Sequence, residues 1–406
     1  MKTARLLPVV AVLAAPVFAH AEDAAPVSKI PLPMLQTLLP ESEKRVSLYG
    51  WLEAGITGNP QGTSDNQNFG RLFDDRNDGP MLNQTALNVE RALAAEKGEW
   101  DWGFKLQGIY GTDARYTRTL GLGDNYGTQM MQADLVEAFA SLHAPVLTEG
   151  GVDFKVGKFA TLNGLETIDP RTNFFYSHSY IFNFGPFTHV GILSTTHLPE
   201  GFDFYAGVTR GASPTSLDDN NRAGAFHGGF GYTAEKYSVI AATHIGPETN
   251  GNTRDLRSFT NVVLNVKATD ALTFSTDISY MQDNAGAGAK AYGLAQYATY
   301  AISGDLSVGL RAEIFCDQEG FFVAQQGKND DFMNFANAEG PIDPRTVGGG
   351  KTTYGALTLG LNWKVDPRLT IRPEVRYDYA LDNNKPFNDS ASCHQATVAV
   401  DAIFTF

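Results

Sequence analysis

From Val46 to its last residue, the chain repeats segments of about ten residues in which apolar or aromatic side chains alternate with small or polar ones. Residues 369–379 show this most clearly, with Leu, Ile, Pro, Val and two Tyr at one parity and Thr, two Arg, Glu and Asp at the other. Because successive side chains of a β-strand point to opposite faces, a period of two indicates strands with one apolar face. The pattern predicts an all-β protein.

Sixteen strands account for the segments, and they are joined alternately by short and long connections. The predicted strands cover residues 46–57, 81–93, 100–111, 133–144, 151–160, 187–198, 202–211, 225–233, 236–246, 257–268, 271–282, 289–302, 305–316, 350–364, 368–380 and 394–406. The long connections cover 58–80, 112–132, 161–186, 212–224, 247–256, 283–288, 317–349 and 381–393. Three segments, 187–198, 225–233 and 289–302, alternate less regularly, which leaves about 14 or about 18 strands as alternatives.

A soluble β-sandwich shows the same alternation, with its apolar parity facing a packed core. Two features favour a barrel that spans a membrane. Alternating short turns and long loops are typical of such barrels, and so are aromatic girdles where the apolar faces end. The aromatic residues at these ends are Tyr110, Tyr280, Trp363, Tyr379 and Phe404. We therefore predict a transmembrane antiparallel β-barrel of about 16 strands over residues 46–406.

Composition agrees with this class and excludes others. The mean hydropathy of the 406 residues is -0.21, and after residue 20 no apolar run reaches the roughly 20 residues of a membrane-spanning helix. This excludes a polytopic helical membrane protein. Charged residues make up 19%, aromatic residues 11% and glycine 41 positions, a balance that suits a many-stranded β-protein. The net charge of -14 argues against a nucleic-acid partner.

Residues 1–21 have the order of a secretory signal peptide. Basic residues precede an apolar stretch over 6–18, and the small residues Ala19 and Ala21 complete a cleavage site. The alternative, a single anchor helix, would need about 20 apolar residues to span the bilayer. We predict export with cleavage after Ala21 and an extended periplasmic segment over residues 22–45.

The chain ends in an alternating segment, 398–406, whose last residue is Phe406. This segment resembles the C-terminal targeting strand of bacterial outer-membrane barrels. The resemblance implies recognition of the Phe406 strand by the barrel-assembly machinery, and insertion into the lipid of a Gram-negative outer membrane.

Several motifs resemble the bacterial family called putative beta-barrel porin 2. They are Leu48-Tyr49-Gly50-Trp51-Leu52-Glu53-Ala54-Gly55, Leu82-Asn83-Gln84 with Glu90-Arg91, Val156-Gly157-Lys158-Phe159, and the runs 164–170, 173–180 and 185–191. The resemblance implies an outer-membrane diffusion porin for small polar solutes that uses no cofactor. Because general porins are commonly trimers, it also implies a homotrimer.

Residues 161–186 form the third long connection, which general porins fold into the barrel. A barrel of about sixteen strands encloses an aqueous lumen, so a segment inside it must set the size limit for solutes. The many Phe and Tyr of this loop are too apolar for a freely solvated segment. The alternative is packing over the barrel mouth or at a subunit interface. The candidate constriction residues are Glu166, Asp169, Arg171, Tyr176 and Tyr180.

Charged residues at the inward parity are the candidates for lining the pore: Lys105, Lys155, Arg311, Glu313, Arg372, Glu374 and Arg376. Charges of opposite sign on loop and wall would create a transverse field that favours polar solutes. Inward-facing acids outnumber the inward-facing basic residues, which favours a mild preference for cations. The alternative is that the pairs are wall salt bridges without a role in selectivity.

Other functions find less support. An adhesin or structural barrel remains an alternative, and so does a hydrolase embedded in the barrel. The Ser177-His178-Ser179 cluster shows no third group to orient the histidine, so no catalytic residue is predicted. No metal-binding motif is predicted either. Cys316 and Cys393 fall near external strand ends, and either a disulfide or two free thiols would fit.

Overall fold

The computed structural model describes residues 34–39, 45–95, 98–119, 121–122, 127–128, 130–212, 220–325, 350–382 and 384–406. The predicted signal peptide, residues 1–21, and most of the predicted N-terminal segment, 22–45, lie outside these residues. In the described part of the chain, no helix has both the length and the apolar character needed to cross a membrane.

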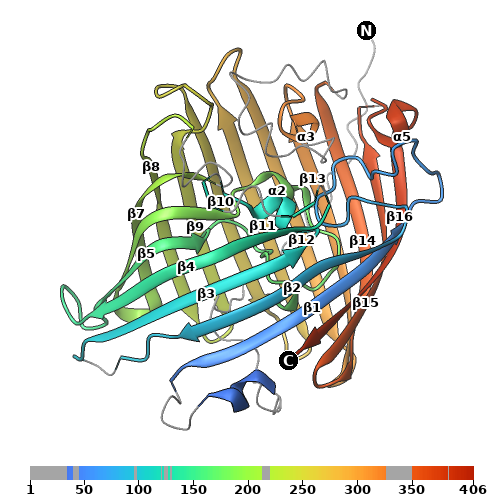
Figure 1. Ribbon diagram of the computed structural model, residues 1–406. Coiled ribbons are helices and arrows are strands. Elements are labelled where there is room, and N and C mark those ends of the chain that lie inside the picture. The colour runs from blue at the N-terminus through green and yellow to red at the C-terminus, as the bar shows by residue number, and fades with distance from the viewer. Residues whose placement is uncertain are drawn as a thin grey trace.

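The described residues form sixteen antiparallel strands that close into one barrel (Figure 1). The strands are β1 (Ser47–Gly58), β2 (Pro80–Arg91), β3 (Asp101–Gly111), β4 (Gln132–Ala144), β5 (Val152–Ala160), β6 (Thr188–His197), β7 (Phe202–Ala212), β8 (Ala225–Ala234), β9 (Tyr237–Pro247), β10 (Leu256–Lys267), β11 (Leu272–Asp283), β12 (Ala289–Ala301), β13 (Leu306–Asp317), β14 (Thr352–Asp366), β15 (Leu369–Ala380) and β16 (His394–Thr405). Each strand pairs with its neighbours in sequence, and β1 pairs with β16 to close the wall. The predicted barrel and its strand number are confirmed.

The apolar parity of each strand faces outward, as β15 shows. Pro373, Val375 and Tyr377 are exposed, whereas the alternating residues Arg372 and Arg376 are buried inside the barrel. A β-sandwich would bury the apolar parity and expose the charged one. The outer surface therefore has the apolar band that a barrel wall presents to lipid.

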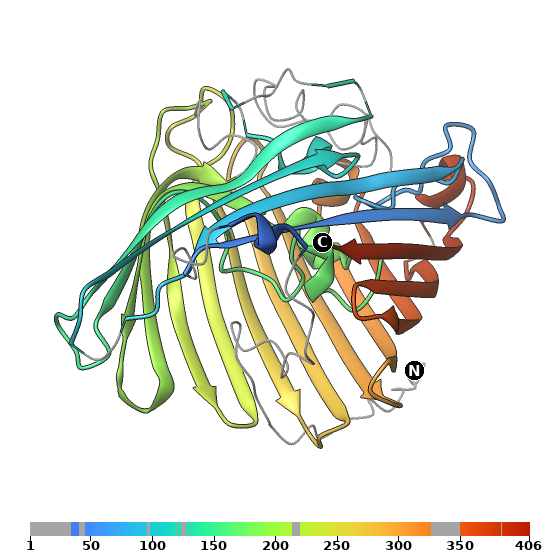
Figure 2. The same ribbon diagram turned by 60° about the horizontal axis from the view of Figure 1, so that its bottom comes forward.

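The two rims of the barrel differ in the length of their connections. At one rim the turns are short, and side chains stabilise them. Asp366 Oδ1, for example, accepts a hydrogen bond of 3.0 Å from Arg368 N between β14 and β15. This rim also holds both ends of the barrel, since Gly50 and Phe406 pair through their backbones at 2.9 Å. Figure 2 shows β1 beside the end of β16.

The other rim carries the long connections, named here L1 (59–79), L2 (112–131), L3 (161–187), L4 (213–224), L5 (248–255), L6 (284–288), L7 (318–351) and L8 (381–393). The short helices of the described residues are η1 (Met34–Leu38) before β1, α1 (Ala114–Thr117) in L2, η3 (Pro170–Thr172) and α2 (Tyr180–Phe184) in L3, η4 (Pro199–Gly201) after β6, α3 (Phe322–Gln325) in L7 and α5 (Phe387–Ser390) in L8. Figure 1 shows that α2 lies within the barrel, enclosed by its strands, rather than above the rim.

Two apolar clusters fill the barrel where L3 lies. One packs L3 against the inner wall of β10–β15 and contains Phe175, Tyr180 and Phe315. The other joins β1–β4 to L1, L2 and L3 around Trp51 and Phe73. L3 is therefore folded inward, and its aromatic residues are hidden from water as their composition predicts.

Cys316 and Cys393 are both free thiols, so the disulfide considered among the sequence alternatives does not form. The reason is the strand order. Cys316 lies in β13, Cys393 directly precedes β16, and β14 and β15 stand between these strands. Three strand spacings amount to about 14 Å, whereas the Cα atoms of a disulfide lie within about 7 Å.

Candidate functional site

The first residues of L3 follow the inner wall from strand to strand. Four consecutive residues each hydrogen-bond a different strand, from β8 to β11. The pairs are Leu162 N to His227 Nε2 (3.1 Å), Asn163 Nδ2 to Ala242 O (3.0 Å), Gly164 N to Asn261 Oδ1 (2.9 Å) and Leu165 N to Asp277 Oδ2 (2.8 Å). The loop thus begins as a layer bound to the wall, and its backbone groups are satisfied away from water.

Arg311 of β13 anchors the middle of L3. Its guanidinium pairs with Glu166 Oε1 at 2.8 Å and donates to Ser177 O at 2.6 Å. Glu166 in turn accepts a hydrogen bond from Ser179 N at 2.7 Å. Arg311 is fully buried, so these charges compensate one another in a site that excludes solvent.

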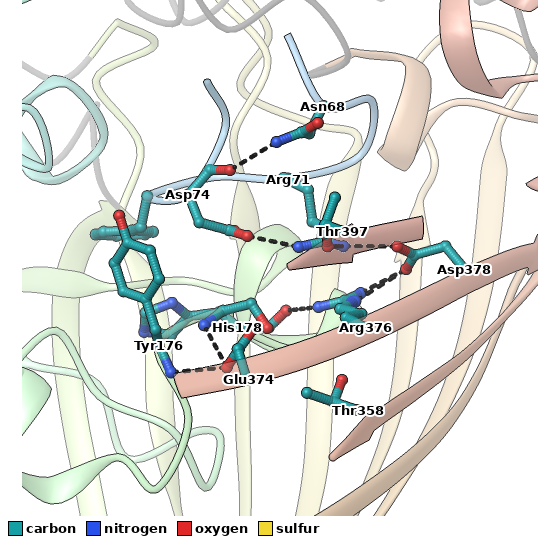
Figure 3. A network of polar contacts seen from close by, with 12 residues as sticks. Asn68, Arg71, Asp74, Tyr176, His178, Thr358, Glu374, Arg376, Asp378 and Thr397 are labelled. Atoms are coloured by element: carbon teal, nitrogen blue, oxygen red, sulfur yellow. Dashed lines mark hydrogen bonds and ion pairs between the residues drawn. The ribbon is translucent and has the colours of Figure 1, made fainter. Parts of the chain in front are cut away.

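Three consecutive inward residues of β15 hold the backbone of L3. Arg372 donates to Pro170 O at 2.9 Å and to Asn173 O at 2.8 Å. Glu374 Oε2 accepts from the backbone N–H groups of residues 176 and 177 at 3.0 and 3.2 Å. Arg376 donates to His178 O at 2.5 Å. Figure 3 shows Glu374 directed at Tyr176 and Arg376 directed at His178.

The two tyrosines of the predicted constriction fasten L3 to other parts of the wall. Tyr176 donates its hydroxyl to Asn83 Oδ1 at 3.0 Å, and its ring lies against Gly55 of β1. Tyr180 opens helix α2, donates its backbone N–H to Glu313 at 2.9 Å and donates its hydroxyl to Asp378 at 3.1 Å. Both side chains are buried; they therefore position the loop and do not face solvent.

Asp169 and Arg171 of L3 remain partly exposed to solvent. They pair with each other at 2.6 Å, and their side chains are 22% and 29% exposed. The guanidinium of Arg171 also lies 4.1 Å from the ring centroid of Trp51 and 5.0 Å from that of Tyr49. Of the five candidate constriction residues, these two are the ones that a solute inside the barrel could touch.

The candidate pore-lining charges divide into two groups. Arg311, Glu313, Arg372, Glu374 and Arg376 are buried beneath L3. Lys105 and Lys155 keep partial exposure; Lys105 pairs with Glu137 at 2.5 Å, and Lys155 lies 5.3 Å from the ring of Phe139. The buried group binds the loop, so its members act on a solute only through the position of L3. Glu166 forms a buried ion pair with Arg311 of the wall, so it does not contribute the predicted transverse field across the lumen.

Sequence reasoning missed that L1 and L2 also enter the barrel. Arg71 of L1 pairs with Asp378 of β15 at 2.7 Å, and Asp75 of L1 pairs with Arg115 of α1 at 2.6 Å. The signal was present, since Phe69, Leu72 and Phe73 give L1 the same apolar character that drew attention to L3.

Burial changes the ionisation of several loop residues. It lowers the pKa of His178 to about 4; Glu166 opposes the shift, and Arg311 and Arg372 add to it by disfavouring a further positive charge. It raises the pKa of Asp74 to about 6, although Arg71 opposes the shift. Burial also raises the pKa of Asp113 to about 7, against hydrogen bonds from Gln84 and Asn83. His178 is consequently neutral at pH 7.

The Ser177-His178-Ser179 cluster serves the packing of L3. Ser177 Oγ accepts from Arg311, Ser179 Oγ caps α2 by accepting from Phe182 N, and the His178 ring stacks on Phe182 at 4.3 Å. Each group is thus engaged in holding the loop. Within the described ranges, no group of three or more His, Cys, Asp or Glu side chains is arranged to hold a metal ion.

Comparisons with known proteins place this architecture. A family model described as putative beta-barrel porin-2, OmpL-like, matches residues 45–406. A comparison with curated protein sequences gives no match.

Among solved structures, Pseudomonas putida OprB is similar with a TM-score of 0.58 at 12% identity, covering 90% of this chain and 95% of its own. The anion-selective porin from Comamonas acidovorans has a TM-score of 0.55 at 11% identity, covering 89% and 99%. The trimer form of OmpT, an outer membrane protein of Vibrio cholerae, has a TM-score of 0.51 at 10% identity, also covering 89% and 99%. At these identities the likeness shows the fold.

Proposed function

This chain belongs to the OmpL-like putative beta-barrel porin-2 family, and from that premise we propose that it is an outer-membrane porin for passive diffusion of small hydrophilic solutes or ions. The observation that carries the proposal is the inward fold of L3. Buried arginines and carboxylates of β13 and β15 bind its backbone across the lumen of a closed barrel. A loop fixed in this way sets the size of the solutes that pass.

The solute class follows from the groups that a solute meets inside the barrel. The partly exposed charges toward the short-turn rim include Lys105, Lys155 and Arg171, with the acids Glu90, Asp153, Asp169 and Asp203. Charges of both signs favour hydrated polar solutes over apolar ones. Acids hold a small majority, although His197 bridges Asp153 and Asp203. We therefore expect a mild preference for cations.

Conductance of the purified, refolded protein in a planar bilayer tests this proposal. We expect discrete channels, a reversal potential in a KCl gradient that indicates mild cation preference, and block by the solutes that permeate. Anion preference would contradict the assignment of charge. A protein that inserts without forming channels would instead be an adhesin or structural barrel, and turnover of lipid or peptide would favour the embedded hydrolase.

Export and assembly form part of the proposal. Residues 1–21 direct the chain across the inner membrane, residues 22–45 remain periplasmic, and the Phe406 strand is read by the barrel-assembly machinery. We propose a homotrimer, supported by the trimer form of the Vibrio cholerae neighbour. Fractionation of cells that express the chain, with and without Phe406, tests the targeting. Cross-linking in intact membranes tests the trimer, and a band at the monomer mass alone would contradict it.

A further inference from the structure

L1 divides into an exposed part and a buried part. Residues 64–66 at its tip are exposed, whereas Gly70–Asp75 are buried without interruption. Arg71, Leu72 and Asp74 have no exposed surface at all. A loop that only covered the rim would keep one face in water, so this run must pack on several sides.

Arg71 clamps the buried part of L1 to the inner wall. One side of its guanidinium pairs with Asp74 at 2.5 Å, and the other pairs with Asp378 of β15 at 2.7 Å. It also donates to Thr397 of β16 at 3.1 Å. Figure 3 shows Arg71 between Asp74 and Asp378. A planar guanidinium with several fixed donors suits such a clamp, because it binds separate acceptors at the same time.

Asp378 joins L1 to L3. Its Oδ2 accepts from Arg71, while its Oδ1 accepts from the Tyr180 hydroxyl at 3.1 Å and from Arg376 Nε at 3.0 Å. Arg376 also binds the backbone of L3 at His178. One carboxylate of the wall therefore holds both loops in a single hydrogen-bonded network.

Phe73 is the apolar counterpart of this clamp. Its ring packs against His178, Phe182 and Phe187 of L3 at centroid distances of 4.9, 5.4 and 5.7 Å, and against Tyr116 of α1 at 5.3 Å. Its backbone has a φ of 69°, a left-handed conformation that is rare for a bulky residue and persists where surrounding contacts enforce it. Phe73 thus ties three loops together inside the barrel.

We propose that Gly70–Asp75 form a second constriction element that shares the lumen with L3, and that Arg71 is the positioning residue that keeps it there. The inference rests on the proposed channel function and extends it. On the barrel wall, the partners of the segment are inward residues of β2, β15 and β16, since Asn83 Nδ2 also donates to Phe73 O at 3.0 Å. L1 therefore occupies the side of the lumen at which the barrel closes, and it reduces the passage that L3 leaves.

Substitution of Arg71 tests the clamp. Arg71→Met keeps an unbranched but shorter side chain and removes both ion pairs, so we expect single-channel conductance to rise by about twofold as the open cross-section widens. The size limit in a liposome-swelling assay should rise with it. Arg71→Lys, which still reaches one carboxylate, should restore part of the wild-type conductance. Arg254→Met, at an exposed arginine of L5, is the matched control and should change neither quantity.

A second measurement does not depend on how Arg71→Met folds. In a Cys316→Ser, Cys393→Ser background, a positively charged thiol reagent is added to Leu72→Cys or to Ser64→Cys while the current is recorded. Ser64 lies in the exposed part of L1, so its modification should be fast and leave the current unchanged. Modification at position 72 should be slow, should lower the current, and should become faster when Arg71→Met is added.

The outcomes separate this inference from the function on which it rests. A wild-type protein without channels would contradict the porin proposal itself. Wild-type channels with a conductance that neither Arg71→Met nor modification at position 72 alters would overturn the second constriction alone. L3 would then set the pore without L1.

Discussion

The ion pair between Arg311 and Glu166 offers the most direct test of how L3 is held. Arg311→Met removes the guanidinium that contacts Glu166 at 2.8 Å, Ser177 O at 2.6 Å and Glu313 Oε1 at 2.8 Å. Methionine fills a similar volume and supplies no donor. The carboxylate of Glu166 is then left buried without its main counter-charge, which is the unfavourable way to break such a pair.

Loss of one partner from a buried ion pair costs about 3–5 kcal/mol. Since about 1.4 kcal/mol corresponds to a factor of ten, local opening of L3 should become roughly 10²–10⁴-fold more frequent. The rest of L3 keeps its contacts with β15, so the barrel itself should stay folded. Glu166→Gln should cost less, about 1–2 kcal/mol, because its amide oxygen still accepts from Arg311. The double variant should lose less stability in L3 than the two single variants lose when their losses are added.

Hydrogen–deuterium exchange in detergent micelles measures the opening directly. The amide of Ser179 is bonded to Glu166 and the amide of Tyr180 to Glu313, so a peptide that covers both reports on this anchor. Lys290→Met, at an exposed residue of β12, is the control. Unchanged exchange of this peptide in Arg311→Met would refute the reasoning, and so would strict additivity in the double variant.

Three further outcomes are expected. Gly55→Ala should displace L3 and alter conductance, because a Cβ at that position would lie 2.5 Å from the ring of Tyr176; unaltered conductance would contradict this contact. The protein should migrate identically in gel electrophoresis with and without reductant, and Cys316 and Cys393 should each react with a thiol reagent after unfolding. Burial lowers the pKa of His178 to about 4, so its neutral form stabilises L3 above about pH 6.5 and loses this effect toward pH 4. From pH 7.5 to pH 4.5, the free energy of opening of L3, measured by hydrogen exchange, should therefore fall in both proteins or in the wild type alone. The fall should be up to about 2–3 kcal/mol larger in the wild type than in His178→Phe.

The wall of the barrel follows from sequence because its rule is local. Successive side chains of a strand alternate between two environments, so the identity of each residue in 369–379 already indicates whether lipid or the interior lies beside it. Apart from the closing pair of β1 and β16, strand order required no long-range information either, since each strand pairs with its neighbour along the chain. The inward course of L3 was predictable from the aromatic residues that water would not tolerate.

The roles of the inward charges could not be derived in this way. Alternation indicates that Arg311, Arg372 and Arg376 point inward, but it does not show whether water or protein meets them there. The loop partners of the wall charges lie far along the chain, as when Arg71 of L1 reaches Asp378 or Glu166 of L3 reaches Arg311. Such pairs depend on the path of loops whose backbone has no repeating pattern to read.

The sequence by itself therefore determined a membrane barrel, its strands, its lipid-facing surface and the inward fold of the aromatic-rich loop L3. Only the tertiary structure decided that L1 and L2 share that place, that the wall charges hold loops rather than line an open pore, and that the two cysteines stay apart. The physical reason is range. Solvation acts on each residue where it stands, whereas ion pairs and packing in the lumen depend on which distant segments meet.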